Sequence, residues 1–198
     1  MKGIYKIMKL QMKFEKIISF VVLISSSICF IFALGITTDI YNLMFLKDFG
    51  VDGYELYFNI QPFNRRLVVL SILMIVLAVT LFITRVHDRR KYYISNYINI
   101  LLLFIINVVI SIWAITKLNF YKQYFLENTD FEGWKFVTTI ISNVKYAEST
   151  FWLDISIITY YISIVSSILL VGNLIWKIVI IRYENNLLSG KIKVEVPL

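Results

Sequence analysis

The chain has 198 residues, of which 59% are hydrophobic and only 17% are charged, and its mean hydropathy is +0.73. Soluble domains are about 45–50% apolar and about 25% charged, so this composition excludes an ordinary soluble domain. With a single cysteine, the chain can form neither an intrachain disulfide nor a cluster of thiolate ligands around a metal.

The first element in chain order is an uncharged apolar run over residues 17–36, preceded by five lysines in residues 1–16. A helix needs about 20 apolar residues to cross the hydrocarbon core, so this run is long enough. A cleavable signal peptide is the alternative, because small residues occur near Ala33. The apolar region of a signal peptide is about 7–15 residues long, shorter than this run. We therefore expect the run to remain in the protein as a membrane helix.

Residues 37–66 form a first loop that is rich in aromatic side chains and contains Gly50, Gly53 and Pro62. Glycine and proline commonly mark turns, so we expect this segment to form a short hairpin or an irregular cap. The second apolar run follows at residues 67–85.

A basic turn separates the second apolar run from the third, which covers residues 94–116. Its basic residues and the only histidine of the chain are Arg85, His87, Arg89, Arg90 and Lys91. We interpret the turn as an anchor that contacts lipid phosphates and sets the orientation of the protein. The alternative is a docking site for a cytoplasmic partner. A catalytic role for the histidine is disfavoured, because no partner residues for catalysis accompany it.

The second long loop, residues 117–150, contains a helical pattern. Thr129 and Glu132 have the spacing of a capping box, which marks the start of a helix. The apolar residues that then recur at helical spacing are Trp134, Val137, Ile141 and Val144. This pattern predicts a short amphipathic helix that lies on the outer membrane face or against a partner.

The distribution of lysine and arginine predicts the orientation of the chain. Residues 1–16, the turn 85–91 and the tail 177–198 carry 5, 4 and 4 of them. The loops 37–66 and 117–150 carry 3 and 4, and each also contains 4 acidic residues. Cytoplasmic flanks are enriched in lysine and arginine, so both termini are predicted to be cytoplasmic. This topology accounts for the net charge of +7 without any nucleic-acid partner.

The predicted fold class is therefore an all-α, multi-pass protein of the cell membrane. Four transmembrane helices are expected to pack as a bundle, with two outer loops, in a single domain over residues 1–198. The predicted spans are residues 17–36, 67–85, 94–116 and 153–176, followed by a cytoplasmic tail at 177–198.

Small and polar residues recur at helical spacing within the third and fourth spans. They include Asn99, Asn107 and Ser111 in the third span, and Ser163, Ser167 and Asn173 in the fourth. Helices in lipid associate through close packing and interhelical hydrogen bonds, so we favour the interpretation that these residues form helix contacts. The alternative is that they line a polar pathway for a transported species.

The sequence lacks the combination of residues that catalysis by a membrane hydrolase would need. A membrane hydrolase needs a nucleophile with a base, or a metal site with several His, Asp or Glu ligands. One histidine and one cysteine supply neither, so we expect no enzyme, catalytic residue, cofactor or metal site.

The function predicted from the sequence is a non-catalytic accessory or scaffolding subunit of a larger membrane complex, such as a transport system. Its partners would be the lipid bilayer and other membrane subunits. The alternative is a small transporter or channel that acts as a homo-oligomer. Coupled carriers usually have ionisable groups deep in the membrane, and none occurs near the middle of these spans. The sequence assigns the chain to no known family.

Overall fold

The computed structural model describes residues 2–85, 94–140 and 149–189, and every regular element in these residues is helical. In chain order the elements are α1 (Lys2–Ile40), the 3-10 helix η1 (Tyr41–Phe49), α2 (Glu55–Arg85), α3 (Ile94–Asn128), α4 (Phe131–Ile140) and α5 (Phe151–Leu188). Four of these, α1, α2, α3 and α5, are long and apolar enough to cross a membrane. The all-helical prediction and its four long apolar helices are confirmed.

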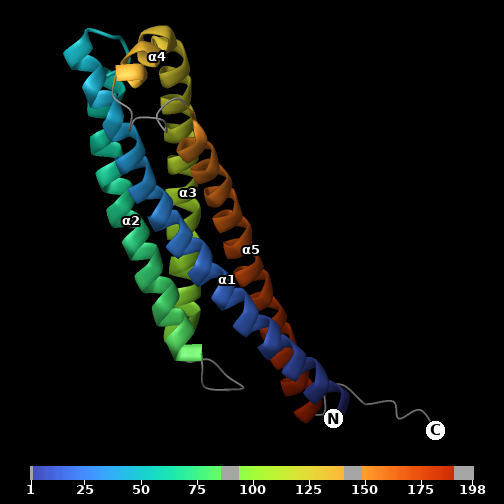
Figure 1. Ribbon diagram of the computed structural model, residues 1–198. Coiled ribbons are helices and arrows are strands. Elements are labelled where there is room, and N and C mark those ends of the chain that lie inside the picture. The colour runs from blue at the N-terminus through green and yellow to red at the C-terminus, as the bar shows by residue number, and fades with distance from the viewer. Residues whose placement is uncertain (1, 86–93, 141–148, 190–198) are drawn as a thin grey trace.

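The four long helices lie side by side (Figure 1). α1 packs against both α2 and α5, and α3 also packs against both α2 and α5. The start of α1 and the end of α5 lie at one end of the molecule, which we call the stem end. The helix α4 lies at the opposite end, which we call the cap end.

Each long helix contains a predicted span and extends beyond it. The helices have 31 to 39 residues, which corresponds to about 47–58 Å at about 1.5 Å per residue. A hydrocarbon core is only about 30 Å thick. The predicted cytoplasmic tail is helical as far as Leu188, and residues 190–198 lie outside the described part of the chain. Helical segments therefore project beyond a membrane-sized slab.

Residues 37–66 are helical over most of their length, so the prediction of a hairpin or an irregular cap is wrong. α1 continues to Ile40, η1 follows directly, and only residues 50–54 separate η1 from α2. Gly50 and Gly53 allow the chain to turn there, since both have positive φ angles, 65° and 117°. Apolar residues in this segment are buried at helical spacing, and they are Leu43, Leu46, Leu56 and Ile60. Burial of this face explains why helix replaces loop.

The start of α4 differs from the predicted capping box. The Oδ1 atom of Asp130 accepts hydrogen bonds from the backbone N–H groups of Glu132 and Gly133, both at 3.1 Å. Asp130 is therefore the residue that caps the helix, one position later than predicted. The hydroxyl of Thr129 is buried and has no hydrogen-bond partner among the described residues.

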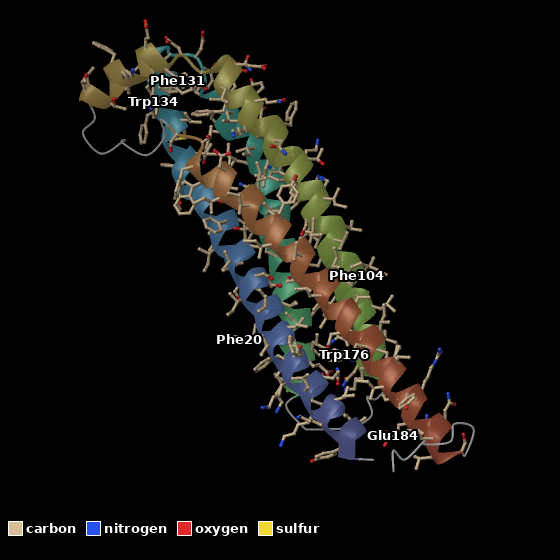
Figure 2. The ribbon with its side chains drawn as sticks, turned by 90° about the vertical axis from the view of Figure 1, so that its right-hand side faces the viewer. Phe20, Phe104, Phe131, Trp134, Trp176 and Glu184 are labelled. Atoms are coloured by element: carbon tan, nitrogen blue, oxygen red, sulfur yellow. The ribbon has the colours of Figure 1, made fainter. Side chains whose placement is uncertain are left out.

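The apolar face of α4 packs into the protein itself, which corrects the prediction of a helix on the membrane surface or against a partner. Trp134 and Val137 are buried in the core of the cap end, and Figure 2 shows Trp134 at this end of the molecule. The face is covered because η1 lies beside α4. Ile141 and Val144, which complete the predicted pattern, lie outside the described residues.

Candidate functional site

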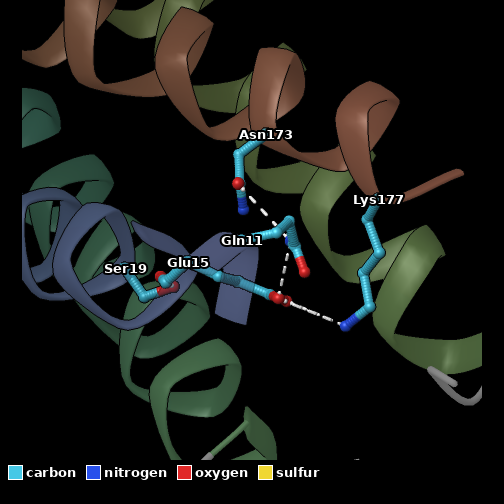
Figure 3. A network of polar contacts seen from close by, with 5 residues as sticks. All are labelled: Gln11, Glu15, Ser19, Asn173 and Lys177. Atoms are coloured by element: carbon cyan, nitrogen blue, oxygen red, sulfur yellow. Dashed lines mark hydrogen bonds and ion pairs between the residues drawn. The ribbon is translucent and has the colours of Figure 1, made fainter. Parts of the chain in front are cut away.

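A buried ion pair joins α1 to α5 near the stem end (Figure 3). The Nζ atom of Lys177 lies 3.2 Å and 3.3 Å from the two carboxylate oxygens of Glu15, and both side chains are only 4% exposed. The Nε2 atom of Gln11 donates to Glu15 Oε2 at 2.9 Å and to Asn173 Oδ1 at 3.4 Å. We call Gln11, Glu15, Asn173 and Lys177 the stem-end network.

Helical spacing explains how the sequence builds this network. Gln11 and Glu15 are four residues apart on α1, and Asn173 and Lys177 are four residues apart on α5. Residues with this separation lie on the same face of a helix, one turn apart. α1 and α5 run in opposite directions and pack together, so the two polar faces meet. The result is a contact between α1 and α5 in which the Glu15 carboxylate and the Lys177 ammonium group neutralise each other.

The burial of this pair makes it sensitive to change. Removing one partner of a buried ion pair leaves an uncompensated charge, and typically destabilises a protein by about 3–5 kcal/mol. Replacing both partners by neutral residues is often close to neutral. The network therefore constrains which residues can occupy positions 15 and 177 together.

A second polar contact lies midway along the long helices and joins α3 to α5. The Oγ atom of Ser163 donates to Asn107 Oδ1 at 2.8 Å. The Nδ2 atom of Asn107 donates to the backbone oxygen of Ser163 at 3.2 Å and to the hydroxyl of Ser167. All three residues are buried. The amide oxygen and amide nitrogen of Asn107 thus both find partners on α5.

The remaining residues of the predicted helix-contact face are distributed differently. Ser111 is fully buried, but its hydroxyl has no hydrogen-bond partner among the described residues. Asn99 is half-buried, and Asn173 belongs to the stem-end network. The structure therefore brings Asn107, Ser163 and Ser167 together, and places Asn173 in a separate site.

The basic turn falls almost entirely outside the described part of the chain. Arg85 is the last residue of α2. The other four residues of the predicted anchor, His87, Arg89, Arg90 and Lys91, lie outside the described residues.

Glu15 and Lys177 were missed by the sequence analysis, because each lies just outside an uncharged run. Glu15 was assigned to the N-terminal flank, and Lys177 to the cytoplasmic tail. Two signals could have identified them. Glu15 is the only acidic residue before position 39, and Lys177 is followed by four more apolar residues, 178–181, so that it interrupts a longer apolar stretch.

The cap end contains a third set of polar contacts. The Nζ atom of Lys122 lies 2.6 Å from Asp154 Oδ1, and Thr150 Oγ1 donates to Asp154 Oδ2 at 2.6 Å. The hydroxyl of Tyr124 donates to Glu55 Oε2 at 3.2 Å. These bonds join α3 to α5 and to α2. The side chains of Lys122 and Asp154 are 33% and 38% exposed, so solvent screens this pair.

A polar groove of about 480 Å³ also lies at the cap end, and its acidic lining residues are Asp52, Glu55, Glu127 and Asp130. Within residues 2–85, 94–140 and 149–189, no group of three or more His, Cys, Asp or Glu side chains is arranged to hold a metal ion.

No known protein family, curated protein or solved structure matches this chain. The fold and the polar contacts define its class directly. It is an all-helical protein with four helices apt to cross a membrane, and its buried polar side chains connect these helices to one another.

Proposed function

We propose that the chain is a multi-pass protein of the cell membrane, with the four long helices forming a transmembrane bundle and the stem end in the cytoplasm. Large apolar side chains are exposed on all four helices, for example Ile24, Val76, Ile105 and Val165, and lipid would cover them. Trp152 and Trp176 of α5 are 24 residues apart, or about 36 Å along a helix. This spacing suits two aromatic belts at the two membrane interfaces.

The proposed orientation rests on charge. Lys6, Lys9, Lys13 and Lys16 are all exposed at the stem end, and lysine-rich flanks are typical of the cytoplasmic side. The cap end would then lie outside the cytoplasm. Reporter fusions after residue 198, or cysteine labelling at exposed Lys47 of η1, test this orientation directly.

We further propose that the protein acts as a non-catalytic accessory or scaffolding subunit of a larger membrane complex, such as a transport system. The observation that carries this proposal is the contact of Asn107 with Ser163 and Ser167. Its hydrogen bonds run from helix to helix, as expected for a contact that holds a bundle rigid. A group lining a pathway would instead present its polar atoms to a passing species.

The cap end offers a surface on which such a subunit would contact partners. Phenylalanines are exposed there on several elements, and they are Phe49, Phe58, Phe120, Phe136 and Phe151. Contiguous exposed apolar side chains mark contact surfaces for proteins or membranes. These side chains stand on helices of the folded chain, so a partner would meet a preformed surface.

Purification from the native host in a mild detergent tests the scaffolding proposal. We expect other membrane proteins to accompany the chain at fixed stoichiometry, as identified by mass spectrometry. Substituting Phe58 and Phe136 by serine should release these proteins without unfolding the chain. A homogeneous oligomer of this chain alone would contradict the proposal.

A homo-oligomeric transporter or channel is the second candidate, and the stem-end network favours it. Buried ionisable groups in membrane proteins often mark substrate or ion pathways, and Glu15 and Lys177 are a buried ion pair close to the proposed inner interface. Flux measurements on the chain reconstituted alone in liposomes distinguish the candidates. Flux that requires Glu15 would support this function, and its absence would favour the scaffold.

A further inference from the structure

The stem end carries a stripe of lysines on the outside of α1. α1 is helical from Lys2 onward, so residues in this segment advance by about 100° each around the helix axis. On this basis Lys6, Lys9, Lys13 and Lys16 fall within an arc of about 80°, and all four are exposed. We call these four residues the lysine stripe.

The N-terminal part of α1 has two further faces beside the lysine stripe, one exposed and apolar and one buried. Leu10, Phe14 and Ile17 fall within an arc of about 60° directly beside the lysine stripe, and they are exposed. Met8, Gln11 and Glu15 form the third face, which is buried. The segment is thus basic on one side, apolar on the next, and packed against the protein on the third.

The negative charge of this segment is turned inward. Glu15 is the only acidic residue in positions 1–16, and its carboxylate is paired with Lys177 in the interior. The exposed surface of the segment therefore presents positive charge next to apolar side chains, with no exposed acidic residue on the same stretch of helix.

Aromatic contacts indicate where this stripe lies relative to a membrane. The rings of Phe14 and Trp176 are in contact, with centroids 6.0 Å apart, and tryptophans near helix ends favour the membrane–water interface. From Phe14 toward the stem end, Lys13 lies one residue away, Lys9 about 7.5 Å away and Lys6 about 12 Å away. A headgroup layer is about 5–8 Å thick, and charges act over about 8 Å at physiological salt. Lys13, Lys9 and Lys6 thus run through the headgroup layer and just beyond it, and Lys16 lies about 3 Å on the other side of Phe14.

We propose that the lysine stripe binds the phosphates of anionic phospholipids in the adjacent leaflet. The apolar face beside it favours a lipid surface over an acidic protein or a nucleic acid, because Leu10, Phe14 and Ile17 continue without a break into the apolar part of α1. Basic residues at this level interact with anionic headgroups, and amphipathic basic helices use the same combination. The proposal rests on the membrane placement given above, but not on the role as a subunit.

Lipid retention by the full chain tests the proposal. The purified protein is incubated in neutral detergent with equal amounts of phosphatidylglycerol and phosphatidylcholine, then gel-filtered, and the retained lipids are measured by mass spectrometry. We expect phosphatidylglycerol to be enriched, and the enrichment to fall at high ionic strength. Each lysine near the surface contributes about a fivefold change at low salt, so the Lys6→Gln, Lys9→Gln, Lys13→Gln variant should lose up to about 100-fold in affinity.

Two control variants separate charge position from total charge and from folding. Substituting Lys47, Lys117 and Lys135 by glutamine removes the same charge from exposed positions in the half of the protein away from the stem end, and should leave the enrichment unchanged. Substituting the stripe lysines by arginine should also preserve it. If the triple glutamine variant does not remain monodisperse, Lys9→Gln and Lys13→Gln as single changes carry the test, each with about a fivefold loss.

Several outcomes would overturn the proposal. A folded stripe variant that keeps the wild-type enrichment would do so, as would an equal loss in the control variant at Lys47, Lys117 and Lys135. Preferential capture of a soluble polyanion such as RNA, without uptake of phosphatidylglycerol, would assign the stripe to another partner. None of these outcomes depends on a partner protein, so failure here leaves the scaffolding proposal standing.

Discussion

Replacing Lys177 by methionine removes the cation from the stem-end network and leaves Glu15 buried without its counter-ion. The carboxylate then either stays charged or takes up a proton. A charged, unpaired group in such a site destabilises a protein by about 3–5 kcal/mol. Protonating a carboxyl with an ordinary pKa of about 4.3 requires about 3.7 kcal/mol at pH 7. Because the lower of these two values limits the loss, we expect Lys177→Met to reduce the free energy of unfolding by about 3–4 kcal/mol at pH 7.

The same argument gives a pH dependence with a definite sign. At pH 5, protonating this carboxyl requires only about 1 kcal/mol. The difference in stability between wild type and Lys177→Met should therefore shrink from about 3–4 to about 1 kcal/mol as the pH falls from 7 to 5. Reversible denaturation in mixed micelles, followed by circular dichroism at both pH values, measures this difference.

Two further variants complete the test of the stem-end network. The double variant Glu15→Gln, Lys177→Met should unfold within about 1 kcal/mol of wild type, because neither charge remains to be buried. Lys122→Met, which breaks the half-exposed pair with Asp154, should change stability by no more than about 1 kcal/mol. The reasoning is refuted if Lys177→Met loses less than about 1 kcal/mol at pH 7, or if the double variant loses as much stability as Lys177→Met alone.

Three other contacts give predictions of their own. Asn107→Leu removes interhelical hydrogen bonds worth about 0.6 kcal/mol each, so we expect a loss of about 1–2 kcal/mol in unfolding free energy; a change in function without any loss of stability would instead favour a polar pathway. Asp130→Ala should lower the stability of the α4 region by about 0.5–2 kcal/mol, seen as faster hydrogen exchange over residues 131–140, whereas Thr129→Val should have little effect. A Cβ atom at Gly35 would lie 2.6 Å from a ring carbon of Trp152, so Gly35→Ala should displace the indole, shift tryptophan fluorescence and reduce stability by about 1–3 kcal/mol. Unchanged fluorescence in that variant would contradict the close contact.

The long apolar helices could be predicted from the sequence because their signal is summed over about 20 residues. The helical part of residues 37–66 could not be predicted, because the glycine, proline and aromatic residues there are typical of a loop. Tertiary burial of Leu43 and Leu46 against the rest of the cap outweighs that local preference. The position of the α4 cap was missed by one residue, because both Thr129 and Asp130 are suitable capping residues and only packing decides between them.

The candidate site was harder to predict than the fold. Whether each residue could be recognised depended on its position relative to the apolar runs. Asn107, Ser163 and Ser167 lie inside apolar runs, so their shared faces were visible in the sequence. Glu15 and Lys177 lie at the ends of such runs, where charges are usually solvated. Only the continuation of α1 and α5 beyond the apolar runs shows that these two charges face each other.

The stem-end network also determines which face of α1 packs against α5, because α1 has a competing apolar face. Leu10, Phe14 and Ile17 could bury more apolar surface against α5 than Gln11 and Glu15 do, if the helix turned about its axis. A buried polar pair opposes this rotation, since turning would separate Glu15 from Lys177. The double variant Glu15→Gln, Lys177→Met should therefore remain stable, but the orientation of α1 about its own axis should no longer be fixed.

Cross-linking with a short bifunctional thiol reagent measures that rotation. In an otherwise wild-type chain without Cys29, the pair Gln11→Cys and Asn173→Cys should be joined efficiently by such a reagent, because the longer wild-type side chains at these positions meet at their tips. We expect cross-linking to fall in the double-variant background. Equal cross-linking in both backgrounds would show that the remaining packing alone fixes the orientation of α1 about its axis. The ion pair would then serve another purpose.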